Sequence, residues 1–90
     1  NPYFDWEGDR RLDASRAAMF YEFGKTYQKI GRREEAIKAS NEALAIRRRL
    51  AEADPESEIA AAALSQSLDL AGDLERENKA YGRSRTLRQG

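Results

Sequence analysis

Two segments with the spacing of an amphipathic helix, separated by Gly31, fill residues 20–44 and limit the possible folds more than any other part of the chain. Residues three and four positions apart lie on one side of a helix, and both segments repeat at that spacing. The second segment has small side chains on that side, so a second helix can lie close against the first. The stretch therefore predicts a helical hairpin. Its spaced residues are Phe20, Phe23, Gly24 and Tyr27 before the glycine, and Ala36, Ser40, Ala43 and Leu44 after it.

The remaining start and stop signals predict an all-α fold of about four helices. Asp13 suits the N-cap of the first helix, because its carboxylate can accept hydrogen bonds from the free amides of a helix start. Gly31 suits the left-handed residue that ends this helix. The Asp54-Pro55 pair suits the start of the third helix, and the Gly72-Asp73 pair a turn before the fourth, with one long bent helix as the alternative. The predicted helices span residues 13–30, 32–53, 55–72 and 74–88.

We expect the first and third helices to bury one side each, because one-sided apolar spacing marks the buried face of a helix. In the first helix this side has Leu12, Arg16 through its methylene stem, Phe20, Phe23, Tyr27 and Ile30. In the third it has Ile59, Ala60, Ala63, Leu64, Leu68 and Ala71.

Residues 17–46 resemble the tetratricopeptide (TPR) signature, a helix-turn-helix of about 34 residues with an aromatic, an apolar-glycine pair, a tyrosine and two alanines at set positions. The second helix continues through EALAIR, which resembles the longer repeats of kinesin light chains. The resemblance implies a solenoid scaffold that binds a peptide or a partner helix. It divides the chain into an N-terminal arm or cap (1–11), a first hairpin (12–54) and a degenerate second hairpin (55–90). The matching residues are Phe20, Phe23, Gly24, Tyr27, Gly31, Ala36, Ala43 and Leu44.

Composition narrows the classes of function. The chain has 90 residues with 16 basic and 16 acidic side chains, and this balance disfavours a nucleic-acid binder, which needs a basic surplus. It has no cysteine and no histidine, which removes disulfides, Cys/His zinc sites and the usual nucleophile systems. We therefore expect no enzyme activity, no cofactor and no metal. No apolar run is long enough to span a membrane, and a cytoplasmic location is expected.

Two charged clusters could suggest ligand binding. Arg47, Arg48 and Arg49 are consecutive, so on a helix they spread over about 200° and cannot all face one groove. We expect them on a solvated face. The alternating acids of residues 52–58 do not form a calcium loop, because Pro55 replaces the glycine that the sharp turn of such a loop requires.

The N-terminal arm has three aromatic residues, Tyr3, Phe4 and Trp6, followed by acids. They could cover the open apolar edge of the hairpin, because one helix pair cannot hide both faces by itself. Alternatively, residues 4–7 are similar to the tryptophan-acidic motifs that kinesin-light-chain TPR grooves bind. A third possibility is that the arm docks into a second copy of the chain.

The resemblance also implies where a partner binds, because TPR ligands usually lie along the first helix of each hairpin. Tyr21 and Lys25 are one turn apart and suit an acidic or carboxylate-bearing partner. The family's carboxylate clamp has Lys where Tyr21 stands and Asn where Lys25 stands, so that subtype is not implied. The alternative is that all these positions are simply solvated. They are Ala18, Tyr21, Lys25, Gln28 and Lys29, then Ala62, Ser65 and Asp69.

The leading hypothesis from the sequence is a protein-interaction module that binds a peptide or partner helix. The alternative is an assembly element, in which two copies pair through open helix faces, by exchange of a hairpin or of the arm, to form a homodimer. It follows from the small number of repeats, since about three are normally needed for a stable solenoid. Nucleic-acid contact through the basic C-terminal residues is a distant third.

Overall fold

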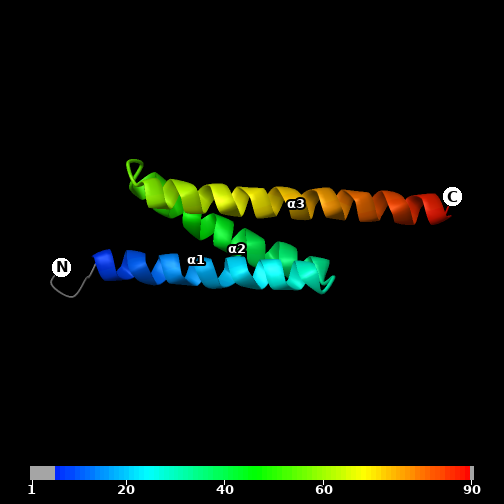
Figure 1. Ribbon diagram of the computed structural model, residues 1–90, viewed down its shortest axis with the longest axis horizontal. Helices are drawn as coiled ribbons and strands as arrows, with labels where there is room; N and C mark the ends of the chain where they lie inside the picture. Colours follow the sequence, from blue (N-terminus) through cyan, green and yellow to red (C-terminus); the bar gives the residue numbers. More distant parts are fainter. Residues whose placement is uncertain (1–5, 90) are drawn as a thin grey trace.

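Three α-helices packed together make up the fold (Figure 1). The computed structural model describes the backbone of residues 6–89 and the side chains of residues 8–82. Helix α1 is Trp6–Lys29, α2 is Arg33–Ala53 and α3 is Glu58–Gln89, and the described residues contain no strand. The all-α class predicted from helical spacing is therefore confirmed.

The turn between α1 and α2 is built around Gly31. Its φ of 83° lies in the left-handed region, which glycine adopts without the steric cost of a Cβ atom. The Gly31 N–H donates to the Gln28 carbonyl oxygen at 3.2 Å, and the Arg32 N–H donates to the Tyr27 carbonyl oxygen at 2.9 Å. The predicted hairpin and its glycine turn are confirmed.

Small residues allow α1 and α2 to lie close together. Ala17 and Ala36 are completely buried. A Cβ atom added to Gly24 would lie 3.4 Å from the Ser40 backbone nitrogen in α2 and 3.2 Å from Leu70 Cδ2 in α3. Gly24 is therefore a point at which all three helices meet, and the close approach expected from the sequence is present.

The start of α1 differs from the prediction. The helix begins at Trp6, so the N-cap assigned to Asp13 is wrong, and residues 6–11 of the predicted arm or cap form the first part of α1. Asp13 lies inside the helix, where its Oδ1 is 3.7 Å from Arg16 Nη1. Ion pairs at this spacing support a helix.

The four-helix prediction is wrong in its second half. Residues 55–72 and 74–88 were expected as two helices forming a second hairpin, with one long bent helix as the alternative. Helix α3 runs without a break from Glu58 to Gln89, so the structure has a single helix here, as in the alternative. Gly72 lies inside this helix, and its φ is not positive. Leu70 and Leu74 are both buried, one on each side of Gly72, and this burial favours a continuous helix over the roughly 1 kcal/mol that a helical glycine costs.

The start of α3 is capped by Ser57. The Ala60 N–H donates to Ser57 Oγ at 3.1 Å, which is the bond that an N-cap side chain makes. Asp54 is not the N-cap, and Pro55 lies in the turn before the helix, so the predicted roles of this pair are wrong. The Ser57 N–H donates to the Asp54 carbonyl oxygen at 3.1 Å and closes that turn.

The buried sides of α1 and α3 also differ from the predicted ones. On α3 the residues that pack inward are Ser67, Leu70 and Leu74, whereas Ile59 is 84% exposed and Leu68 is also exposed. The alanine-rich start of α3 can pack on more than one side, so the spacing of its larger residues did not identify the contact. On α1 part of the predicted side lies in solvent, because Leu12, Phe23 and Ile30 are exposed.

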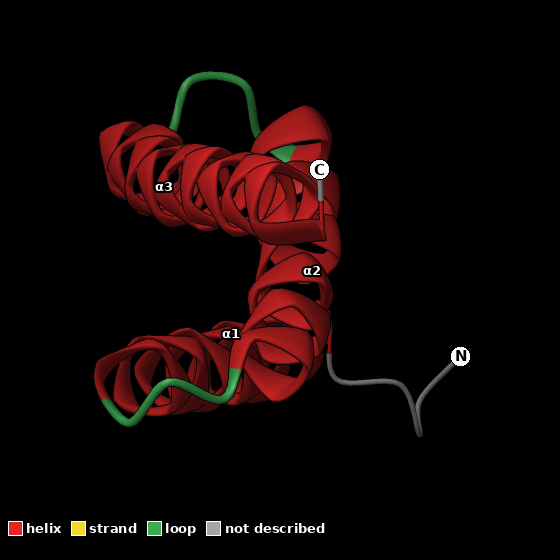
Figure 2. Cartoon of the chain, turned by 90° about the vertical axis from the view of Figure 1, so that its right-hand side faces the viewer, coloured by secondary structure: helices red, strands yellow, loops and turns green. Residues whose placement is uncertain are grey.

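In cross-section the three helices form a C, with α2 as the back and α1 and α3 as two arms on the same side of it (Figure 2). Helix α3 is the longest and extends beyond the turn between α1 and α2 (Figure 1). Near that turn the Arg33 guanidinium lies 3.6 Å from the centre of the Tyr81 ring and ties the hairpin to α3. We call the side between the two arms the α1–α3 face.

Candidate functional site

All three helices contribute to a cleft of about 360 Å³ at the end of the molecule where α3 begins. It has a basic part and an apolar part. We call it the arginine cleft, and its lining consists of Arg10, Arg11 and Ala14 of α1, Arg47 and Leu50 of α2, Ser57, and Ile59, Ala60 and Ala63 of α3.

Arg47 extends from α2 to the space between α1 and α3. It is only 8% exposed. Its Nη1 donates to the Ala63 carbonyl oxygen at 3.2 Å and to Ser67 Oγ at 3.1 Å. Its guanidinium carbon lies 4.8 Å from the centre of the Tyr21 ring, within the range of a cation–π contact. One α2 side chain thus contacts both arms of the C.

The buried charge of Arg47 has no counter-ion among the described residues, since no carboxylate forms an ion pair with it there. A guanidinium has five N–H donors, and the two printed bonds leave Nε and Nη2 without protein partners in that part of the chain. Burial lowers the pKa of Arg47, while Tyr21 and Glu22 act in the opposite direction. Arginine nevertheless stays protonated at neutral pH. The side chain therefore keeps its positive charge although it is almost completely buried at the cleft.

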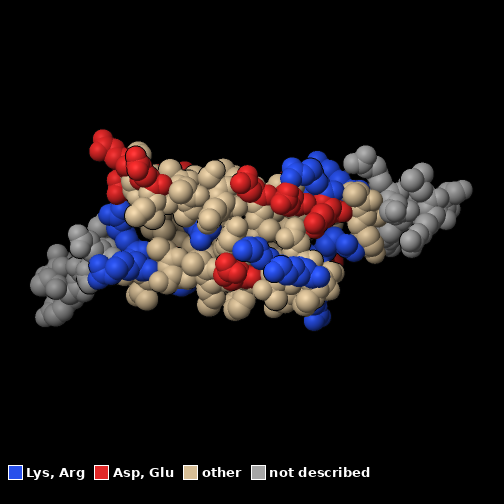
Figure 3. All heavy atoms as spheres, viewed as in Figure 1, with Lys and Arg blue, Asp and Glu red and all other residues tan. Residues whose placement is uncertain are grey.

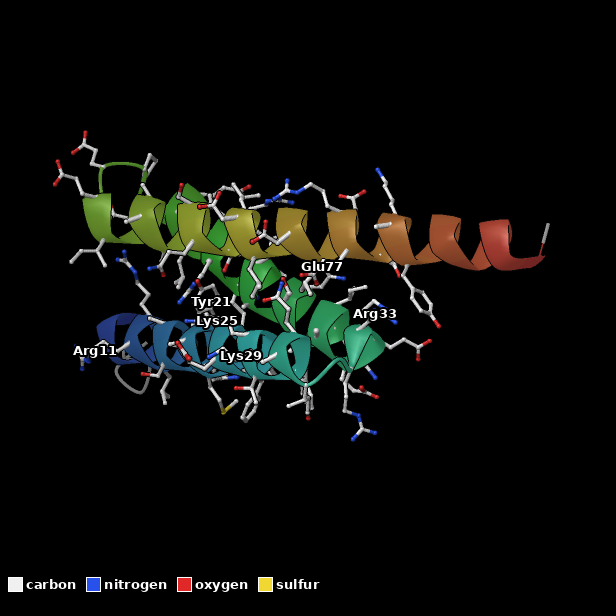
Figure 4. All side chains as sticks on the ribbon, turned by 45° about the vertical axis from the view of Figure 1, so that its right-hand side comes forward. Arg11, Tyr21, Lys25, Lys29, Arg33 and Glu77 are labelled. Atoms are coloured by element: carbon white, nitrogen blue, oxygen red, sulfur yellow. The ribbon has the colours of Figure 1, made fainter. Side chains whose placement is uncertain are left out.

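The other two arginines of the cleft, Arg10 and Arg11, differ in whether an ion pair balances their charge. Arg10 Nη2 is 3.1 Å from Asp54 Oδ2, so its charge is partly balanced. Arg11 forms no ion pair within residues 8–82, and it lies near the N-terminal end of α1 (Figure 4). The described lining therefore contains three guanidinium groups and no carboxylate, and one of the three is paired with Asp54.

The sequence-predicted residues of α1 lie along the α1–α3 face. Tyr21 and Lys25 lie at the edge of α1 nearest α3, with Lys29 further along the same helix and Glu77 on the facing edge of α3 (Figure 4). The Lys25 Nζ lies 5.2 Å from the centre of the Tyr21 ring and 3.7 Å from Glu22 Oε1. The structure thus brings Tyr21 and Lys25 together with Arg47, which contacts the same ring.

Gln28 crosses from α1 to α3, because its Nε2 donates to Glu77 Oε1 at 3.1 Å. Charges are unevenly distributed over this side of the molecule. Lysine and arginine predominate over α1, and aspartate and glutamate over much of α3 (Figure 3). The electrostatic attraction for an acidic group is therefore expected along α1 and at the arginine cleft.

The structure does not join Ser65 and Asp69 to this group. Both are exposed, and each is two residues from the buried Ser67, which places it about 200° around the helix from the α2 contact. Neither makes a hydrogen bond or ion pair with α1 in the described part of the chain. Of the predicted docking arm, Tyr3 and Phe4 and the side chain of Trp6 lie outside the described residues.

Arg47 is the residue that the sequence interpretation placed wrongly, since it was expected on a solvated face with its two neighbours. Arg48 and Arg49 are indeed exposed. A signal was available, because Arg47 continues the small-residue series of α2 at helical spacing, after Ser40 and Ala43. That series marks the packed side of α2. An arginine that continues it therefore points its side chain toward the protein interior.

Among the described helices, none combines the length and the apolar character that a membrane-spanning segment requires. Within the same residues, no group of acidic side chains is arranged to hold a metal ion.

Comparison of the chain with protein-family models, with curated proteins and with solved structures finds no match. What the protein does is therefore inferred from the residues of the α1–α3 face themselves.

Proposed function

We propose that the chain is a protein-interaction module of the TPR type, and that it binds an acidic peptide across its α1–α3 face. The observation that carries the proposal is Arg47, a buried guanidinium that lies against Tyr21 and lines an open cleft without a protein counter-ion in the described residues. A buried charge without a partner destabilises a fold, and such costs are typically retained at functional sites.

The arrangement of the helices supports a TPR-like hairpin followed by one helix of a further unit. In this interpretation α1 and α2 are the hairpin, and α3 takes the place of the next first helix. TPR hairpins place successive first helices on the same side, as α1 and α3 are here (Figure 2). The α1–α3 face would then correspond to the ligand-binding side of the family, which is where the resemblance had put Tyr21 and Lys25.

Charge supports an acidic partner. Within the described residues, Arg11, Lys29 and Arg47 have no ion-pair partner. Three cations without counter-ions on one side attract an acidic chain and increase its rate of association. The half-buried Tyr21 adds an aromatic side chain, a residue type that often contributes strongly to binding energy at protein interfaces.

Selection of binders from a displayed library of random peptides tests this proposal. We expect the selected peptides to be acidic, and Lys25→Glu to weaken their binding about tenfold or more, because the change places a carboxylate against an acidic ligand. Binding is measured by fluorescence anisotropy. Lys25 is not buried, so circular dichroism should show an unchanged helix content.

Lys38→Glu is the matched control, because it makes the same charge change on α2, among residues that line the opposite side of the hairpin. It should leave binding almost unchanged. Failure to select any peptide, or an equal loss in both variants, would contradict the assignment of the binding face.

A second candidate is self-association through α1. Four exposed apolar residues follow one side of this helix at intervals of seven, four and seven. This spacing is the same in both directions, so two antiparallel copies related by a two-fold axis would match every apolar residue with another. Exposed apolar stripes of this kind often mark protein contacts. The residues are Leu12, Met19, Phe23 and Ile30.

Light scattering coupled to size-exclusion chromatography tests this candidate. We expect a concentration-dependent dimer that Phe23→Glu converts to a monomer. Leu68→Glu is the control, since Leu68 on α3 is exposed to the same extent as Phe23, 47% in both cases. A wild-type chain that stays monomeric at high micromolar concentration would exclude the dimer.

A further inference from the structure

The arginine cleft has one feature that the rest of the α1–α3 face lacks, which is a fixed guanidinium. Arg47 is held by the Ala63 carbonyl and by Ser67 Oγ through Nη1 alone. Its position is therefore set by the protein, while Nε and Nη2 remain available to a ligand. Pairs of N–H groups in this fork geometry match the two oxygens of a carboxylate.

Arg11 provides a second charge at the same cleft. It is exposed and unpaired within residues 8–82, whereas Arg10 is engaged with Asp54. The cleft thus combines one preorganised guanidinium with one that is free to move onto a ligand. An uncharged polar group would not balance either charge, so the chemistry favours an anion.

The remaining lining is apolar. Leu50, Ala60 and Ala63 face the cleft, and Ile59 stands at its edge with 84% of its surface exposed. An anion alone would leave this surface in water. A ligand with an aliphatic group next to its charge would cover it and gain from its burial.

We propose that the arginine cleft is the subsite for one acidic side chain of the bound peptide, with an aliphatic residue beside it. Arg47 and Arg11 bind the carboxylate, and Leu50 and Ile59 contact the aliphatic side chain. The subsite rests on the proposed function, since it is part of the same peptide-binding face, and it specifies which sequence feature that face selects.

The test uses three synthetic peptide pools with the full chain. All contain random uncharged residues around a fixed centre, and all are acetylated at the N-terminus. The first has Glu-Leu at the centre and an amidated C-terminus, and the second has Gln-Leu and is also amidated. The third has Gln-Leu and a free C-terminal leucine, so it offers a carboxylate only at the chain end.

The primary measurement is the NMR signal of the arginine Nε–H groups in protein labelled with ¹⁵N-arginine. We expect the Glu-Leu pool to shift the signals of Arg47 and Arg11 and to bind about tenfold more tightly than the Gln-Leu pool, because a charge-assisted hydrogen bond is lost with the carboxylate. A response to the free-carboxylate pool alone would overturn the assignment to an acidic side chain.

Variants distinguish specific carboxylate binding at the arginine cleft from nonspecific electrostatic attraction to the chain. Arg11→Gln changes an exposed residue and should reduce the preference for Glu-Leu over Gln-Leu, whereas Arg49→Gln removes the same charge outside the cleft and should not. Because Arg47 is buried, Arg47→Lys serves as the second variant. It keeps the charge, loses the fork and should reduce the same preference, and an unaltered preference in both Arg11→Gln and Arg47→Lys would overturn the proposal.

The outcomes distinguish failure of the carboxylate subsite from failure of the proposed peptide-binding function. If both amidated pools bind equally and Tyr21→Ala abolishes both, the peptide-binding function holds and the carboxylate subsite is rejected. If no pool shifts any signal of the α1–α3 face, both are rejected.

Discussion

Helix α2 has two interfaces of different chemical character. Where it meets α1, the buried residues are small and apolar, such as Ala17, Gly24 and Ala39. Where it meets α3, Arg47 and Ser67 are buried beside the leucines. The first interface brings two backbones close together through small residues, whereas the second buries a hydrogen-bonded charge as well. The difference is what the proposed function requires, with a hairpin that stabilises the fold and a contact with α3 that also holds the group proposed to bind the ligand.

Ser40 reinforces this contrast. It is almost completely buried, and its Oγ has no hydrogen-bond partner among the described residues. It lines a second cavity between α2 and α3, together with Ile37, Leu44 and Leu74. A buried hydroxyl without a partner lowers stability. The contact between α2 and α3 therefore has two unfavourable features, an unpaired hydroxyl and a cavity.

The largest effect on this comparison is expected from Leu74→Ala. Leu74 is 1% exposed and packs with Leu70 on Ala36, so its removal leaves a cavity at the apolar part of the α2–α3 contact. Such changes cost about 2 to 5 kcal/mol. Chemical denaturation should show this loss, and Leu68→Ala, an exposed leucine on the same helix, should cost far less. Similar losses in the two variants would contradict the assigned side of α3.

Gly24→Val should have the next largest effect, at the contact of α1 with α2. The added Cβ would lie 3.4 Å from the Ser40 nitrogen and 3.5 Å from the Ala36 carbonyl oxygen, and two further methyl groups would have to fit against this backbone. Overpacking of this kind costs about 1 to 3 kcal/mol. Thermal unfolding measures it. Gly82→Val is the control, because within the described part of the chain no other helix lies within 4 Å of a Cβ built at Gly82. Equal melting temperatures for Gly24→Val and wild type would mean that the two helices can separate at little cost.

The same contrast explains which parts of the structure the sequence could predict. The hairpin follows from local signals, since Gly31 must adopt a positive φ and the small residues of α2 lie at helical spacing. The continuity of α3 does not, because Gly72 is compatible with a turn and with a helix. Burial of Leu70 and Leu74 against α2 decides between the two, and that contact joins residues far apart in the chain.

The candidate site was predictable to a similar extent. Tyr21 and Lys25 were identified through the resemblance, and the structure places both on the face between α1 and α3. Ser65 and Asp69 were also taken from the resemblance; the structure leaves both exposed and, among the described residues, without a hydrogen bond or ion pair to α1, so their role stays a prediction. Arg47 was missed because its burial depends on where α3 lies. Composition favours a solvated arginine, and only the series of small residues before it indicates the contrary.

Arg47→Met should have the smallest effect on stability and the clearest effect on function. Methionine fills a similar volume without a charge, and replacing a buried ion by an apolar residue is often neutral or stabilising. The loss of the two hydrogen bonds from Nη1 opposes the gain from removing the buried charge. The free energy of unfolding should therefore change by only about 1 kcal/mol or less. Binding of acidic peptides should fall about tenfold or more, because the fixed guanidinium is gone.

Arg49→Met is the matched control for both measurements, since Arg49 is exposed on the same helix and lies outside the cleft. A large loss of stability in Arg47→Met alone, with peptide affinity unchanged, would show that the arginine is structural and that the two interfaces of α2 differ only in composition. An unchanged or raised melting temperature together with lost affinity would show that α2 accepts a buried charge at its α3 side for the sake of the ligand. Stability and affinity, measured on the same variants, therefore decide whether the α1 interface of α2 contributes mainly to folding and the α3 interface to ligand binding as well.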